Sequence, residues 1–185
     1  VWPITDDRLL VVVDPLDGST NASKGLPWFA TSLCVVDRHG LRAALVAEQS
    51  GSETRYGASR GGGANRDGVP VRVNPIAYVS QAVVGTNGAP PYPHGWWLFR
   101  TLGAAALDIS LVATGGLDGY VDFHDHGVWD YLAAVLICQE AGAIVGEVDG
   151  KDLLTIDPLA RRSPVVASSQ AIFDSLIDTA RANRH

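Results

Sequence analysis

The alternation of apolar and polar residues predicts strands and helices that follow one another along the whole chain. Short apolar runs bounded by Gly, Pro, Asn or Asp are typical of strands, and longer segments with apolar residues at helical spacing are typical of helices. Residues 9–13 are all apolar, which predicts a strand buried on both faces. Further strands are expected at residues 29–36, 41–47, 53–56, 81–85, 119–123, 143–148 and 164–167.

Three segments have the apolar spacing of helices. Residues 100–114 and 129–140 are apolar around most of their circumference, so both helices are expected to be largely buried. Either Ser168 or Ser169 is a suitable N-cap for a last, amphipathic helix that follows it.

Strands and helices interleaved in this way predict an α/β or layered α+β fold. The strands of the first half are separated by hairpin-length turns and are expected to form an antiparallel meander. The glycine-rich stretch at residues 59–68 lacks the G-x-x-x-x-G-K-[ST] pattern of a phosphate loop, so we expect a hairpin turn there. We predict one domain over residues 1–185, with an antiparallel-sheet half at 1–75 and an α/β half at 76–185.

Composition narrows the range of partners. The 20 acidic and 14 basic residues leave a net charge of −6 with no basic run, so nucleic-acid binding is not expected. No apolar run approaches the ~20 residues of a membrane span, so no membrane association is expected. Cys34 and Cys138 lie in apolar contexts and are expected to be buried thiols, as in a reducing compartment such as the cytoplasm. Because the chain begins at Val1 and contains no Met, we expect a further segment upstream.

The first strand leads directly into the most informative motif, D-P-L-D-G-S-T. Asp14 and Asp17 are two carboxylates at one strand end, and carboxylates are ligands that Mg²⁺ prefers. Gly18 begins a turn that can open a helix, with Ser19 or Thr20 as its N-cap, and backbone N–H groups at a helix start bind phosphate. The alternative is an ordinary acidic turn after a strand.

Two further sets of residues are candidates for metal binding. Asp130 lies at the start of a predicted buried helix, where it would be a third carboxylate or only an acid that stabilises the helix dipole. The rival set, His124, Asp125, His126 and Asp130, has the alternating histidines that hold zinc or another transition metal. A serine nucleophile is not expected, because there is no G-x-S-x-G elbow.

Four segments in this order resemble the inositol monophosphatase family of Mg²⁺-dependent, lithium-sensitive phosphatases. They read VVVDPLDGSTN, GAAALDISLVATGGLDGYVDF, WDYLAAVLICQEAGAIV and RRSPVVASSQAIFDSL. The resemblance implies the αβαβα sandwich of inositol monophosphatases and sugar phosphatases without its N-terminal helices.

The resemblance implies a role for each residue of the metal site. Asp14 would ligate and bridge the cations, the Leu16 carbonyl would complete one coordination shell, and Asp17 and Asp130 would hold a second ion. Two or three Mg²⁺ ions per site are implied. Ser19, where many relatives have threonine, would orient the attacking water. Asp14, Asp17, Ser19 and Asp130 are therefore the expected catalytic residues.

The resemblance also implies how substrate would bind. The backbone N–H groups of Gly18 and Ser19 would hold the phosphate. The alcohol would be approached by residues at or near a helix start and by two acids, namely Gly103, Ala104, Ala105, Asp122 and Asp130. Asp122 stands where relatives place a glutamate that binds substrate hydroxyls, and its shorter side chain leaves the identity of the alcohol open.

The chain departs from the family pattern in two places. A further metal-ligating glutamate and a lysine-bearing loop of the family would fall before Val1, together with the N-terminal helices. The segment between Gly85 and Arg100 is also shorter than the helix-containing stretch usual there. The sequence is thus expected to be either a fragment or a reduced family member with an incomplete site.

These observations predict hydrolysis of a small polyol phosphate monoester by metal-activated water, with inositol monophosphate as first choice. The alternatives are the related esters fructose 1,6-bisphosphate, 3′-phosphoadenosine phosphates and histidinol phosphate. Another alternative is a non-catalytic protein that binds metal or phosphate, or an inactive fragment. The resemblance further implies a homodimer and inhibition by lithium.

Overall fold

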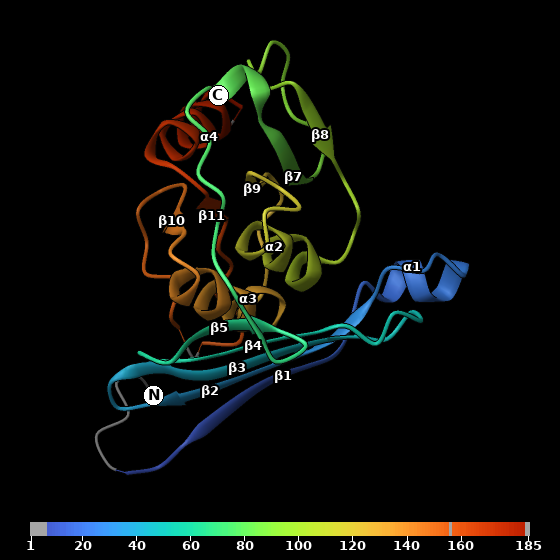
Figure 1. The fold of residues 1–185 in the computed structure, drawn as a ribbon, viewed down its shortest axis with the longest axis vertical. Coiled ribbons are helices and arrows are strands. Elements are labelled where there is room, and N and C mark those ends of the chain that lie inside the picture. The colour runs from blue at the N-terminus through green and yellow to red at the C-terminus, as the bar shows by residue number, and fades with distance from the viewer. Residues whose placement is uncertain (1–6, 156, 184–185) are drawn as a thin grey trace.

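Two sheets with helices between them make up a computed structural model of the protein, which describes residues 7–155 and 157–183. Figure 1 shows the first sheet below helices α2 (Ala105–Ala113) and α3 (Val128–Glu140), the second sheet above them, and α4 (Gln170–Ala182) beyond it. Helix α3 packs on the first sheet, while α4 packs on the second. The predicted mixed α/β class is therefore confirmed, in a β-α-β-α order of layers over the described residues.

The first sheet is the antiparallel meander that the turn spacing predicts. Its strands pair in sequence order, and the short helix α1 (Ser19–Lys24) lies between the first two. The six strands are β1 (Leu10–Asp17), β2 (Ala30–Asp37), β3 (Gly40–Glu48), β4 (Arg55–Ser59), β5 (Gly63–Arg66) and β6 (Val69–Val71). The glycine-rich stretch forms the β4–β5 hairpin and leads into the next, so the expectation of a turn there is confirmed.

The second sheet has mixed strand directions and the order β10-β11-β9-β7-β8. Strand β7 runs parallel to both β8 and β9, so the carboxyl ends of β7 and β9 lie at one edge. Its strands are β7 (Val83–Asn87), β8 (Leu98–Arg100), β9 (Gly119–Asp122), β10 (Ile144–Glu147) and β11 (Pro164–Ala167), with a 3₁₀ turn, η1 (Val79–Gln81), before the first. The segment between β7 and β8 lies wholly within the described residues, and it contains no helix.

The two buried helices are apolar on all sides because each lies between two sheets. Eight residues of α2 and nine of α3 are buried, and both contribute to the main core. Cys34 and Cys138 are free and buried in this core, as predicted, and burial raises the pKa of each thiol to about 12. In the described part of the chain no helix combines the length and apolar character that a bilayer crossing requires.

Several sequence-based expectations about these elements were wrong. Strand β1 is partly buried on one face and exposed on the other, where Val11 and Val13 are 53% and 46% exposed. The reason is its place at the edge of a sheet whose other face has no helix among the described residues on it. Helix α2 begins at Ala105 rather than at residue 100, because residues 98–100 pair with β7 instead.

The predicted helix caps were also only partly right. Gly18, not Ser19 or Thr20, is the N-cap of α1, and it adopts a left-handed conformation with φ of 79°. Ser169 is the N-cap of α4, but its side chain makes no capping hydrogen bond.

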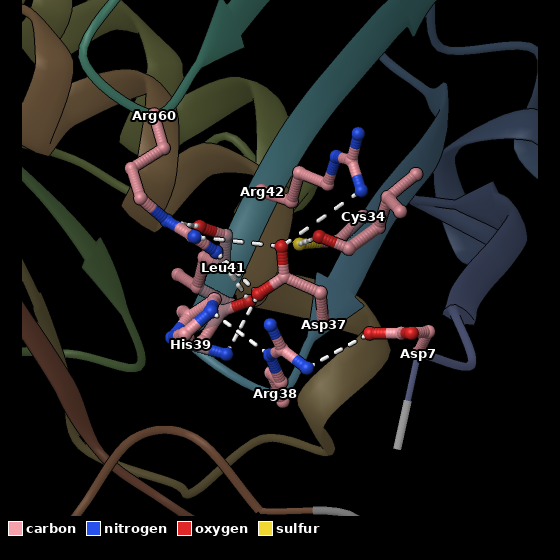
Figure 2. Close-up of polar contacts among 10 residues, drawn as sticks. Asp7, Cys34, Asp37, Arg38, His39, Leu41, Arg42 and Arg60 are labelled. Carbon is pink, nitrogen blue, oxygen red and sulfur yellow. Dashed lines mark hydrogen bonds and ion pairs between the residues drawn. The ribbon is translucent and has the colours of Figure 1, made fainter. Parts of the chain in front are cut away.

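A cluster of polar side chains holds the β2–β3 turn, far along the strands from the D-P-L-D-G motif. Figure 2 shows Arg60 reaching across β3 to Asp37, where its Nη2 lies 2.8 Å from Oδ1. This hydrogen bond lowers the pKa of Asp37. Arg38 reaches Asp7 in the same cluster. Because Asp17 pairs with Ala30 at the opposite end of β2, this cluster is separate from the acidic motif.

Candidate functional site

Three carboxylates from two distant parts of the chain converge where β1 ends. Asp14 and Asp17 come from β1, and Asp130 comes from the first turn of α3. One carboxylate oxygen of each lies within 4.8 Å of the others, and this is the one such group of potential metal ligands in residues 7–155 and 157–183. The strand is irregular between Asp14 and Asp17, where Pro15 interrupts the pairing with β2. This irregularity brings both acids to one point.

Backbone donors fix the orientation of each acid. The Ala106 N–H, at the start of α2, donates to Asp17 Oδ2 at 2.8 Å. The Leu16 N–H donates to Asp14 Oδ1 at 2.9 Å, and the Gly127 N–H donates to Asp130 Oδ2 at 3.0 Å. Each carboxylate is therefore oriented before any ligand binds.

The crowding of acids raises the pKa of two of them. Burial raises the pKa of Asp17 to about 7; the hydrogen bond from the Ala106 N–H opposes this shift, and the charges of Asp130 and Asp14 add to it. Burial also raises the pKa of Asp130 to about 6; nearby His126 opposes this shift and Asp14 adds to it. Carboxyl groups in such surroundings favour either a proton or a cation.

The donor set fits a hard divalent cation. Three carboxylates supply oxygen ligands only, which suits Mg²⁺ better than a transition metal. Among the described residues no Lys or Arg forms an ion pair with any of the three. A cation is thus the charge that would balance this cluster.

The turn after Asp17 is packed too closely for any residue but glycine. A Cβ on Gly18 would lie 2.9 Å from Ala104 Cβ and 2.9 Å from the Trp28 carbonyl oxygen. Asn21, which is buried, donates through Nδ2 to the carbonyl oxygens of Trp28 and Leu102, at 2.8 Å each. The start of α1 and the start of α2 are therefore held against one another.

Asp108 completes this scaffold and has no obvious signal in the sequence. It is 2% exposed, and its Oδ1 accepts a hydrogen bond of 2.7 Å from Trp28 Nε1. Burial raises the pKa of Asp108 to about 7, although Trp28 and the backbone N–H groups of residues 102–104 work against the shift. The carboxyl thus holds the loop before α2. Only its place in a hydrophobic helix could have marked it out.

A small pocket of about 80 Å³ adjoins the acidic cluster. Asp17 and His126 lie in its wall, so it extends from the metal-ligand candidates toward the edge of the second sheet. Its other lining residues are Thr86, Asn87, Gly103, Ala104, Ala105, Asp108 and Tyr120. The predicted substrate-binding residues at the start of α2 therefore line a pocket beside the carboxylates.

Asp122 lies behind this pocket rather than in its wall. Its side chain is fully buried, and Oδ2 lies 2.8 Å from His126 Nδ1. Burial disfavours a charge on His126, but the hydrogen bond to Asp122 and the negative charges of Asp122 and Asp130 together raise the pKa of His126. The rival metal set is not assembled, because His124 and Asp125 are exposed and His126 turns toward Asp122.

Leu16 and Ser19 lie beside the carboxylates and are exposed, Leu16 by 41%. Ser19 is the first residue of α1, directly after the N-cap Gly18. The roles of the Leu16 carbonyl, the Ser19 hydroxyl and the Gly18 and Ser19 N–H groups remain predictions.

The whole chain was compared with known proteins, and it matches the inositol monophosphatase family over residues 2–185. The chain belongs to this family. An inositol-1-monophosphatase of Rhizobium meliloti (strain 1021) is 35% identical over 161 residues, which cover 79% of this chain and 59% of that protein. A putative Nus factor SuhB of Neisseria meningitidis serogroup A is 35% identical over 156 residues, which cover 76% of this chain and 59% of that protein.

Solved structures agree with this assignment. A solved structure described as an inositol monophosphatase-fructose 1,6 bisphosphatase matches with a TM-score of 0.83 and 28% identity. The match covers 92% of this chain and 70% of that protein's chain. The chain spans 59% of the length of each of the two curated relatives above. The chain is therefore related to metal-dependent phosphatases. The acidic cluster is where a metal would bind.

Proposed function

We propose that the protein catalyses Mg²⁺-dependent hydrolysis of a small polyol phosphate monoester, with inositol monophosphate as the first substrate to test. One observation carries this proposal. The oxygens of Asp14, Asp17 and Asp130 lie within 4.8 Å of one another beside a pocket lined by polar groups. That arrangement suits a phosphate held on a metal with its alcohol in the pocket.

Each residue of the cluster has a part in this reaction. Asp14 would bridge the cations, while Asp17 and Asp130 hold a second ion, with the Leu16 carbonyl as a further ligand. Mg²⁺ at this site would supply charge stabilisation for transfer of the phosphoryl group to water. We place two or three ions in the site by analogy with the family.

The turn after β1 would bind the phosphate and position the nucleophile. The N–H groups of Gly18 and Ser19, at the start of α1, would bind the phosphate. The Ser19 hydroxyl would orient the attacking water. Residues 103–105 would face the alcohol across the pocket.

Other properties of the family extend the proposal. We expect inhibition by lithium, which would replace the more weakly held cation, and a homodimer in solution. The two free, buried cysteines favour a reducing compartment, so we place the protein in the cytoplasm. A phosphate ester is the expected partner.

Two alternatives keep specific support. A solved relative carries fructose 1,6-bisphosphatase in its description, so a sugar bisphosphate is the second substrate to test, before 3′-phosphoadenosine phosphates and histidinol phosphate. A relative described as a putative Nus factor favours a non-catalytic protein that binds metal, phosphate or a macromolecule.

Phosphate release from myo-inositol 1-phosphate, with and without Mg²⁺, tests the proposal. Asp130→Asn should lower metal-dependent turnover by about 100-fold or more, because it removes a charged ligand. Asp178→Asn, an exposed acid on α4, should leave turnover unchanged. Turnover without metal, or an Asp130→Asn variant of normal rate, would contradict the proposal. Mg²⁺ and phosphate binding without turnover of any of these esters would favour the non-catalytic alternative.

A further inference from the structure

The Asp122 carboxylate is already committed to other protein groups. Its Oδ1 accepts hydrogen bonds from Asn87 Nδ2 at 2.9 Å and from the His124 N–H at 2.8 Å. Its Oδ2 lies 2.8 Å from His126 Nδ1. Since the side chain is fully buried, a substrate hydroxyl has no path to it. The direct binding of substrate hydroxyls that the family resemblance implies for Asp122 is therefore blocked by burial.

Asn87 and His126 reach the pocket because of the sheet topology. Strands β7 and β9 are parallel, and Asn87 pairs with Asp122 at their carboxyl ends. Ligands of α/β sheets commonly bind at such strand ends. Both Asn87 and His126 line the pocket that Asp17 enters from the metal-ligand cluster.

His126 is held rigidly on two sides. Its backbone forms an isolated bridge with Arg162, in which the His126 N–H donates to the Arg162 carbonyl oxygen at 2.7 Å and the Arg162 N–H donates to the His126 carbonyl oxygen at 3.0 Å. An ionised carboxylate only accepts hydrogen bonds, so Nδ1 must donate to Asp122. The ring is thereby fixed with Nε2 as the nitrogen that does not bind Asp122. A ring positioned in this way costs little further ordering when a ligand binds.

Nε2 keeps capacity for a ligand. Its hydrogen-bond partner is Asn87 Nδ2 at 3.4 Å, which is longer than an ordinary hydrogen bond. The His126 side chain keeps 16% of its surface exposed, in contrast to Asp122. A pocket of about 80 Å³ has room for several water-sized groups such as hydroxyls.

We propose that His126 and Asn87 form the subsite that binds hydroxyl groups of the substrate alcohol, and that Asp122 is a positioning residue that orients His126. The inference rests on the proposed function and adds to it the residues that select the alcohol. It replaces direct recognition by Asp122 with recognition through an imidazole and an amide. The ligand class is a phosphate ester whose alcohol carries free hydroxyls.

Binding of two stable phosphonates separates this inference from the proposed function. Methylphosphonate presents a phosphoryl group without hydroxyls, and the phosphonate analogue of inositol 1-phosphate presents both. Calorimetric titration in the presence of Mg²⁺ should show that the protein prefers the inositol phosphonate. His126→Ala should reduce this preference by about tenfold, the value of one lost hydrogen bond, and leave methylphosphonate binding unchanged.

Control variants distinguish recognition from folding. His124→Ala removes an exposed neighbouring imidazole and should keep the full preference, while His126→Gln restores a polar group near Nε2 and should recover part of it. If His126→Ala does not fold, Asn87→Ala removes the other side chain of the same subsite, which comes from β7. Asp122→Asn should shift the ¹⁵N resonances of the His126 ring away from the Nδ1–H tautomer, which a merely structural change would not do.

The outcomes are distinct. Normal methylphosphonate binding with an unchanged preference in His126→Ala and Asn87→Ala would overturn this inference alone. The absence of any preference in the unmodified protein would do the same. Failure of the unmodified protein to bind methylphosphonate with Mg²⁺ would overturn the proposed function, and the subsite with it.

Discussion

Replacing Gly18 with alanine tests how closely the turn after Asp17 packs against the start of α2. Gly18 has φ of +79°, which L side chains rarely adopt. A Cβ there would lie 2.9 Å from both Ala104 Cβ and the Trp28 carbonyl oxygen. The substitution therefore combines a backbone penalty with a steric one.

The two costs can be separated with a matched variant. Gly25 also has a left-handed conformation, with φ of +70°, but a Cβ there would meet nothing within 4 Å. The left-handed conformation costs about 1–2 kcal/mol for a residue with a Cβ. Forcing extra volume into a packed site adds about 1–3 kcal/mol. Gly25→Ala should thus lower the free energy of unfolding by the first amount only, and Gly18→Ala by the sum of both.

Urea unfolding of the two variants and the unmodified protein measures this difference. Gly18→Ala should also weaken Mg²⁺ binding, because Asp17 and the start of α2 must move apart, whereas Gly25→Ala should not. If Gly18→Ala were no more destabilising than Gly25→Ala, the result would contradict the close packing of Gly18 against the start of α2.

Buried acids make both metal affinity and stability sensitive to small changes. The raised pKa values of Asp17 and Asp130 mean that Mg²⁺ must displace protons at low pH, so the affinity should rise about tenfold between about pH 6 and about pH 8. Calorimetry in buffers of different ionisation enthalpy should detect the released protons, and a pH-independent affinity would contradict the burial of Asp17. Trp28→Phe leaves the buried Asp108 carboxyl without its Nε1 donor and should cost about 1–3 kcal/mol in urea unfolding. A loss below about 0.5 kcal/mol, as for an ordinary surface change, would show that this hydrogen bond is unimportant.

The elements and the three acids could be predicted because their signals are local. Strand patterns, hairpin turns and the D-P-L-D-G motif each lie within a few residues, and Asp130 marks the start of an apolar helix. The exposed face of β1 could not be read in the same way. Five apolar residues in a row look alike whether a strand is covered on one side or on both, since the cover comes from elsewhere in the chain.

The residues that support the site are brought together by contacts between distant segments of the chain. Trp28 and Asp108 are 80 residues apart, and Asn21 and Leu102 are 81 apart. No local pattern marks such pairs. Asp122 and His126 show a related limit, because the sequence gives their identity but not which of them faces the pocket. That distinction depends on the parallel pairing of β7 and β9.

The central claim is that Asp14, Asp17 and Asp130 form one metal site, and calorimetric titration with Mg²⁺ tests it most directly. The unmodified protein at about pH 8, where the acids are ionised, should bind Mg²⁺ saturably. Asp130→Asn should weaken that binding by about tenfold or more, and Asp178→Asn should leave it unchanged. Equal binding by Asp130→Asn and the unmodified protein, or no saturable binding by the latter, would contradict the claim.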